Sequence, residues 1–171
     1  MRLILILLLM LPLTSWAQDD LTLYPGKGVG TVKLNKTTEN ELRKIYGTNF
    51  TLDTSYNNYL LDYSVLGLKF KINPETHKVT VVIAYGNFQG KTEKDIKLET
   101  SILGDAYIKY RRRYIMQGKN EIFYVCKKIQ FVSRCNCNNM LKITENEADK
   151  LPIQEIWIAK TFKLGPVINI E

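Results

Sequence analysis

Residues 28–47 read GVGTVKLNKTTENELRKIYG, a stretch that contains the signals of a short strand followed by a helix. The helix should begin at Thr37 or Thr38, because Thr38 followed three residues later by Glu41 fits a capping box. Gly47 should end the helix, since glycine adopts the left-handed conformation after a last turn without strain. This stretch predicts a β-α unit.

The same pattern returns 64 residues later, where Val32-Lys33-Leu34 corresponds to Ile96-Lys97-Leu98. Further matches follow in the same order: Thr37 with Ser101, Glu41 with Asp105, Tyr46 with Tyr110, Tyr63 with Tyr124, 68–70 with 129–131, and 81–84 with 156–159. Matched blocks in one order indicate an internal duplication. We therefore predict an α+β fold of two β-α-β-β-β repeats, about 28–86 and 94–163, with one short helix per repeat and an antiparallel sheet.

Alternating side chains locate the other strands of each repeat. Lys69 and Lys71 alternate with apolar residues, which predicts a strand with one face on the core and the other in water. In the first repeat, strands are expected at 30–34, 58–63, 68–72 and 78–85. In the second, strands are expected at 95–98, 122–126, 129–133 and 153–162, with a helix from 101 to about 112. An insertion at 134–151 lengthens the second repeat, and such loops are more often functional or disordered than structural.

The start of the chain has the pattern of an export signal. A positive charge at Arg2 precedes an uncharged apolar run, 3–13, and small residues at Ser15 and Ala17 fit a cleavage site. The run is too short to cross a membrane, which takes about 20 apolar residues, and no second long apolar run follows. We therefore expect residues 1–17 to be a signal peptide and 18–171 to be one mature domain, periplasmic or secreted. Its net charge falls from the +7 of the 171-residue chain to +6 with the loss of Arg2.

The sequence argues against an enzyme. Its single histidine, His77, lies in an expected turn, so a Ser/His/Asp or Cys/His mechanism has no well-placed base. The glycine-rich 26–30 lacks the Lys-Ser/Thr ending of a phosphate-binding loop. We expect no catalytic site, no metal and no cofactor.

Basic residues are densest in KYRRRY at 109–114. They follow the second expected helix, where cations are favoured by the helix dipole, and a solvated helix end is the simplest interpretation. Arginine and tyrosine together are also typical of interface anchors. The predicted partner-binding set is Lys109, Tyr110, Arg111, Arg112, Arg113, Tyr114, Lys127, Lys128 and Arg134. Its expected partner is an acidic protein rather than a nucleic acid, which the compartment disfavours.

Three cysteines, Cys126, Cys135 and Cys137, should pair in an oxidising compartment, yet their number is odd. Cys126 and Cys135 are expected at opposite ends of a hairpin, too far apart for a disulfide, which needs Cα atoms within ~7 Å. The same objection applies less severely to Cys126–Cys137, and a Cys135–Cys137 ring is short and easily reduced. A redox or partner-linking loop and a structural bridge with a buried thiol both remain open.

The opening Gly28-Val29-Gly30-Thr31-Val32-Lys33-Leu34, with Thr37-Thr38, Glu41-Leu42 and Tyr46-Gly47, resembles that of the β-lactamase-inhibitor-protein-like fold. It also resembles the smaller outer-membrane lipoproteins of the SmpA/OmlA type. The chain departs from the pattern at Asn35, where glycine is common, at Arg111, which stands where the first repeat has Gly47, and in lacking a lipobox cysteine. The resemblance implies a binding role, with a protein held on a concave sheet, and transfers no functional residue.

We therefore expect an exported protein-binding module, such as an inhibitor or a toxin-immunity protein. An envelope scaffold that binds anionic wall or lipid material is the alternative. A thiol–disulfide protein that uses Cys135 and Cys137 is a third hypothesis, although these residues lack the usual C-x-x-C spacing at a helix start.

Overall fold

The computed structural model describes residues 20–54, 59–111, 114–118, 120–135 and 144–162. The expected signal peptide, Arg112, Arg113, Cys137 and part of the expected insertion, 136–143, lie outside these residues. Within the described part of the chain, no helix has the length and apolar character needed to span a membrane.

Helix α1, Glu39–Tyr46, forms where the sequence predicts it. The backbone N–H of Thr38 donates to the Glu41 carboxylate at 2.8 Å, and the Glu41 N–H donates to the Thr38 hydroxyl at 3.3 Å. Gly47 caps the other end with a φ of 83°. The capping box and the helix end at Gly47 are confirmed, but with a ψ of −169° Gly47 is not in the expected left-handed helical conformation.

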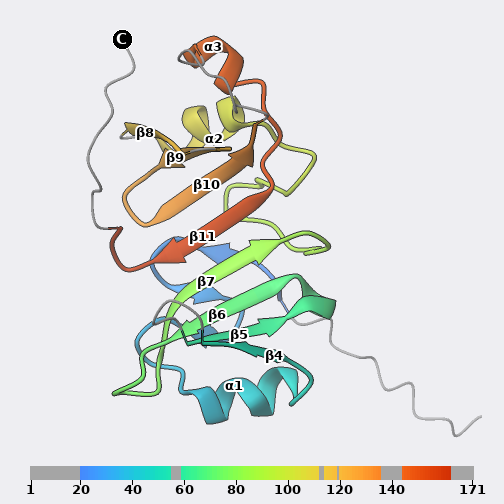
Figure 1. Cartoon of the computed structure of the whole chain (residues 1–171), viewed down its shortest axis with the longest axis vertical. Coiled ribbons are helices and arrows are strands. Elements are labelled where there is room, and N and C mark those ends of the chain that lie inside the picture. The colour runs from blue at the N-terminus through green and yellow to red at the C-terminus, as the bar shows by residue number, and fades with distance from the viewer. Residues whose placement is uncertain (1–19, 55–58, 112–113, 119, 136–143, 163–171) are drawn as a thin grey trace, which may run out of the picture.

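Eight strands form one antiparallel sheet in the order β4-β5-β6-β7-β11-β10-β9-β8. Their bounds are β4 Thr51–Asp53, β5 Leu60–Tyr63, β6 Leu68–Ile72, β7 Val79–Tyr85, β8 Tyr114–Gln117, β9 Glu121–Val125, β10 Ile129–Arg134 and β11 Glu155–Ala159. The centre of the sheet is the β7–β11 pair, in which Val82 lies opposite Ile158. Strands from the two halves of the chain thus meet at the middle of the sheet (Figure 1).

A smaller sheet of three short strands lies behind β7 and β11 (Figure 1). It consists of β1 Leu23–Tyr24, β2 Gly28–Val29 and β3 Val32–Lys33. Leu23, Val29 and Val32 are almost fully buried and join the main hydrophobic core. The small sheet therefore packs on the core side of the large one.

The helices flank the ends of the molecule on that same side. Helix α1 lies at one end, and α2, Leu103–Tyr110, lies with α3, Glu145–Ala148, at the other (Figure 1). Tyr46 of α1 stacks on Phe70 of β6, and Tyr110 of α2 packs on Phe131 of β10, with ring centroids 5.6 and 5.3 Å apart. Phe70 and Phe131 point to the same face of the sheet, so both helices cover that face. The architecture is α+β, with mostly antiparallel strands and three short helices.

Several sequence predictions differ from the structure. The expected strand at 95–98 is absent, although Ile96 and Leu98 are buried, because the segment folds into turns with positive φ at Asp95 and Glu99. Helix α2 is shorter than expected and ends at Tyr110. Strands β1, β2, β4 and β8 have no counterpart in the prediction, and β8 arises from the end of the basic segment itself.

Candidate functional site

The two faces of the large sheet differ in what covers them. On the core face, alternate residues of β5 to β7 and β9 to β11 are buried beneath the helices and the small sheet. On the opposite face, most side chains of β5, β6, β7 and β11 are only half-buried, Ile83 and Ala159 being the buried ones, and no described helix or strand lies over them. Toward β9 and β10 the side chains on this second face are buried, as Val125, Gln130 and Val132 show. The half-exposed region in the middle is the candidate site.

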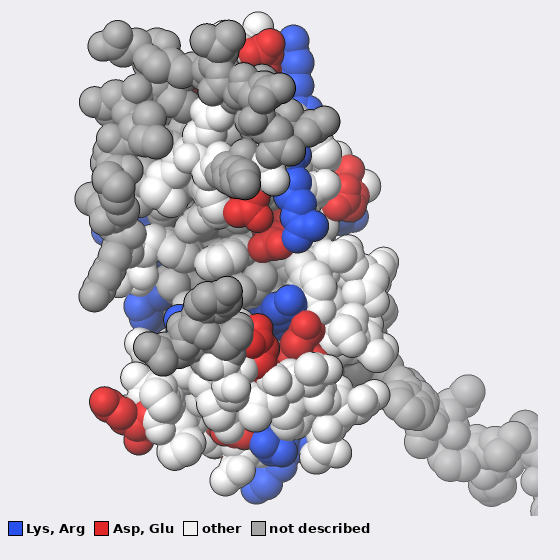
Figure 2. Space-filling view, in the orientation of Figure 1, with Lys and Arg blue, Asp and Glu red and all other residues white. Residues whose placement is uncertain are grey.

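Six polar and aromatic side chains connect across this region. We call them the sheet-face network: Asp62, Lys69, Tyr85, Arg134, Glu155 and Trp157. They come from five strands, β5, β6, β7, β10 and β11, and the alternation of each strand directs them to one face. Figure 2 shows acidic and basic side chains next to one another along the middle of this face.

The first part of the network is a three-residue cluster. The Tyr85 hydroxyl donates to Asp62 Oδ1 at 2.5 Å, and Lys69 Nζ lies 3.3 Å from Asp62 Oδ2. The same ammonium stands 4.5 Å from the centre of the Tyr85 ring, a cation–π contact. The Lys69 and Asp62 side chains remain 35% and 22% exposed, so the cluster is ordered yet reachable from solvent.

This arrangement keeps Tyr85 protonated. Burial raises the pKa of its phenol, and the hydrogen bond and negative charge of Asp62, with the further charge of Glu155, raise that pKa more. Tyr85 therefore acts as a hydrogen-bond donor over the whole physiological range, and it is not a candidate base.

The second part of the network is built around Glu155. Its Oε2 accepts from Trp157 Nε1 at 2.7 Å, and its Oε1 lies 3.3 Å from Arg134 Nη2. The Arg134 side chain is 67% exposed, whereas Glu155 is 18% exposed. One carboxylate thus orients a tryptophan and an arginine, two residue types that dominate binding energy at protein interfaces.

The predicted partner-binding residues do not form one patch. Lys109, Tyr110 and Arg111 lie at the end of α2, on the helix-covered face of the sheet. Tyr110 packs against the hydrophobic core, where its ring contacts Phe131. Its burial there raises the pKa of its phenol. Arg112 and Arg113 fall outside the described residues.

The remaining members are divided between the two ends of the β9–β10 hairpin. Lys127 and Lys128 are exposed in its turn. Arg134 lies at the far end of β10, and its side chain is on the opposite face from α2, in the sheet-face network. Tyr114 begins β8, and its side chain is not among those that the structure describes. Of the nine predicted residues, the structure places Arg134 in the network.

Sequence reasoning missed Asp62, Tyr85, Glu155 and Trp157. The available signal was the alternation of β6, which places Lys69 on the face away from the core. Its cross-strand neighbours could be found only once the register was known: Asp62 lies opposite Lys69, and Tyr85 lies opposite Glu155.

The cysteines follow the geometry expected of them in part. Cys126 directly follows β9 at the hairpin turn, and Cys135 follows β10 at the other end. The Cys126 side chain is a thiol, 3% exposed, so no disulfide joins it to Cys135. Cys137, the other disulfide candidate for Cys135, lies outside the described residues.

His77 is exposed in the turn between β6 and β7, as the sequence predicts, and takes no part in the network.

Comparison of the chain with protein-family models, curated proteins and solved structures gives no match.

Proposed function

We propose that the mature chain is an exported protein-binding module, an inhibitor or an immunity protein, that contacts its partner through the sheet-face network. The observation that carries the proposal is the grouping of Trp157, Tyr85 and Arg134 on one accessible sheet face. Tryptophan, tyrosine and arginine are the residues most enriched at interface hot spots. Here each of them is held in place by a carboxylate, which reduces the ordering cost of binding.

The charges of the network favour a specific docked orientation. Asp62 and Glu155 alternate with Lys69 and Arg134 along the face. Such mixed charge gives specificity and register, whereas the net charge of +6 expected for the mature chain steers an acidic partner during encounter. The cations at the end of α2 lie away from the network and contribute to this long-range attraction.

The proposal includes an origin by tandem duplication and a β-lactamase-inhibitor-protein-like fold. Support comes from the order of elements: α1 precedes β4 to β7, and α2 precedes β8 to β11. Each set of four strands occupies one half of the sheet, in mirrored order about the β7–β11 pair. In that arrangement the network straddles the junction of the two repeats.

Affinity capture tests the proposal. Residues 18–171 are immobilised, exposed to envelope extracts of the producing host and neighbouring strains, and the retained proteins are identified by mass spectrometry. The contact variant is Trp157→Ala, and the matched control is Ile108→Ala, which truncates a residue that is 78% exposed on α2. Unfolding curves of both variants confirm that each is folded.

A stoichiometric protein retained by wild type and Ile108→Ala, and lost by Trp157→Ala, is the expected result. Retention that survives Trp157→Ala but is lost on charge reversal at Arg111 would move the contact surface to the end of α2. Absence of any stoichiometric protein in all extracts would overturn the protein-binding function.

A further inference from the structure

Four lysines line one cavity, three from the beginning of the domain and one from its end. The cavity has a volume of about 410 Å³ and lies beside the small sheet, within the size range typical of ligand pockets. We call it the lysine cavity; its charged and aromatic lining residues are Asp20, Tyr24, Lys27, Lys33, Lys36 and Lys160. Lys160 directly follows β11, so the cavity joins the beginning and the end of the domain.

Two glycines allow the backbone to form this cavity. A Cβ on Gly28 would lie 2.0 Å from the carbonyl oxygen of Val32, and a Cβ on Gly30 would lie 2.1 Å from that of Asp20. Both residues also have positive φ, 138° and 50°. Any side chain at these positions would push apart the β2–β3 hairpin or displace the segment at Asp20 that forms one wall.

The charges of the cavity are not balanced. Four lysines and one carboxylate line it, and none of the four lysines forms an ion pair with another residue in the described part of the chain. The carboxylate of Asp20 is already engaged, since it accepts from the Thr22 N–H at 2.9 Å and from the Tyr24 hydroxyl at 3.3 Å. The lining therefore carries a net positive charge, which an anion placed in the cavity would offset.

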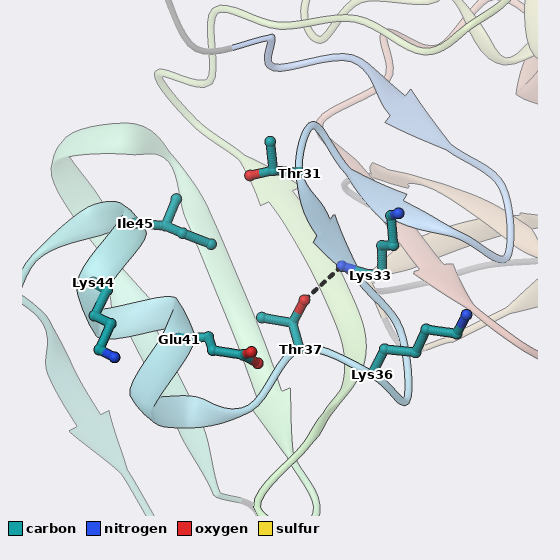
Figure 3. Close-up of a pocket in the computed structure, with 7 residues that line it drawn as sticks. All are labelled: Thr31, Lys33, Lys36, Thr37, Glu41, Lys44 and Ile45. Carbon is teal, nitrogen blue, oxygen red and sulfur yellow. Dashed lines mark hydrogen bonds between the residues drawn. The ribbon is translucent and has the colours of Figure 1, made fainter.

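A neighbouring cavity extends the same positive wall. Lys33 and Lys36 also line a second hollow of about 390 Å³, together with Lys44 and Glu41. In Figure 3 the side chains of Lys33 and Lys36 extend away from α1. Glu41 forms no ion pair with either lysine among the described residues, and its carboxylate accepts from the backbone N–H and the hydroxyl of Thr38.

We propose that the lysine cavity binds a ligand that carries two or more phosphate groups. Lysine is a compact point charge suited to phosphate, and several lysines around one hollow match several anionic groups rather than one. The shared chemistry is found in a free oligophosphate and in the headgroup of a phospholipid that carries two phosphates, such as cardiolipin. The cavity lies beside the small sheet, on the opposite side of the large sheet from the sheet-face network, so this inference does not depend on the proposed function.

Two probes distinguish the sources of phosphate. Inorganic tripolyphosphate is titrated into residues 18–171 by calorimetry at low ionic strength, and co-sedimentation is measured with cardiolipin-containing vesicles against phosphatidylcholine vesicles. The test variant is Lys33→Gln/Lys160→Gln. The control variant is Lys78→Gln/Lys150→Gln, which removes the same charge from lysines that line neither cavity.

Saturable binding of at least one probe is expected, with a loss of affinity of at least ~tenfold in the test variant and at most ~twofold in the control. Binding of tripolyphosphate alone assigns a soluble oligophosphate, and selective sedimentation with cardiolipin assigns a headgroup. Equal weakening in both variants would mean that net charge attracts the probe without a site. That result, or no binding of either probe, would overturn the inference.

Discussion

The Tyr85 hydroxyl on β7 donates a 2.5 Å hydrogen bond to the carboxylate of Asp62 on β5, across the intervening β6, whose Lys69 pairs with the same carboxylate. A tyrosine reaches two strands away because its ring lies flat beneath the lysine ammonium. The contact links three strands through side chains, in addition to their backbone ladders. It therefore stabilises the half of the sheet that carries the sheet-face network.

Tyr85→Phe should lower the free energy of unfolding by about 1–2 kcal/mol, because it removes a hydrogen bond to a charged group and keeps the ring. Tyr24→Phe is the matched control, since the Tyr24 hydroxyl also meets a carboxylate, that of Asp20, but at 3.3 Å in an exposed position. Urea unfolding followed by circular dichroism measures both variants. Equal effects in the two variants would contradict a structural role for the Tyr85 contact.

The same contact predicts a pH dependence. The pKa of Tyr85 is raised in the folded state, so folding favours the neutral phenol. Its contribution is fully present below the unfolded pKa of about 10 and is lost as the pH rises from there toward the folded pKa. Wild-type stability should therefore fall more steeply between about pH 9.5 and 11 than that of Tyr85→Phe. Parallel decline of the two proteins in urea titrations would contradict this prediction.

Ile158 and Ile108 test the assignment of the core. Ile158 lies on the central strand β11 and is fully buried, whereas Ile108 on α2 is 78% exposed. Ile158→Ala should cost about 2–5 kcal/mol of unfolding free energy, through lost burial and the cavity left behind. Ile108→Ala should change it by less than about 0.5 kcal/mol. Thermal and urea unfolding of both variants would show this difference, and a large loss in Ile108→Ala would place that residue in an interface.

Local signals in the sequence predicted the elements that depend on local chemistry. Helix α1 follows from Thr38, Glu41 and Gly47, whose caps satisfy backbone groups within a few residues. Strand β6 follows from the alternation of lysines with buried apolar residues, and its predicted bounds, 68–72, match the structure. Such features need no knowledge of the rest of the chain.

Elements stabilised by distant contacts could not be predicted in the same way. The segment 95–98 has strand-like alternation, but Thr92 binds the Ile96 N–H through its hydroxyl and the chain turns instead. The edge strand β4 is exposed along its length, so it has no buried pattern to detect. The network and the lysine cavity join residues up to about 140 positions apart, and only the sheet register and the docking of the small sheet bring them together.

The cysteines give a prediction for chemical labelling. Cys126 is 3% exposed, so its thiol should react slowly with Ellman's reagent in the native protein. After unfolding in non-reducing denaturant, one thiol per chain should react if Cys135 and Cys137 are bonded to each other. Peptide mapping would then find Cys126 alone in the labelled peptide. Three reactive thiols, or a bridged peptide that contains Cys126, would contradict the pairing.

The last prediction concerns the ends of the two main helices. Gly47 and Arg111 both follow a last helical turn with positive φ, 83° and 52°, and each N–H donates to a carbonyl four residues earlier. Glycine adopts this conformation without strain, whereas a residue with a Cβ is strained there. Gly47→Ala should therefore destabilise the protein by about 1 kcal/mol, and Arg111→Gly should stabilise it by a similar amount.

Arg111→Ala separates backbone strain from charge in this experiment. Alanine removes the guanidinium but keeps the Cβ, so it should give little of the gain expected from glycine. A Cβ at Gly47 would meet no other atom within 4 Å, so the cost of Gly47→Ala would come from the backbone conformation alone. Opposite signs for Gly47→Ala and Arg111→Gly in urea unfolding would indicate that both positions favour glycine because of their positive φ, although ψ is −169° at Gly47 and 78° at Arg111. The two positions lie 64 residues apart, which is the same spacing that separates Val32-Lys33-Leu34 from Ile96-Lys97-Leu98. Such a result would therefore favour descent from one duplicated unit, in which the second copy has lost its helix-ending glycine.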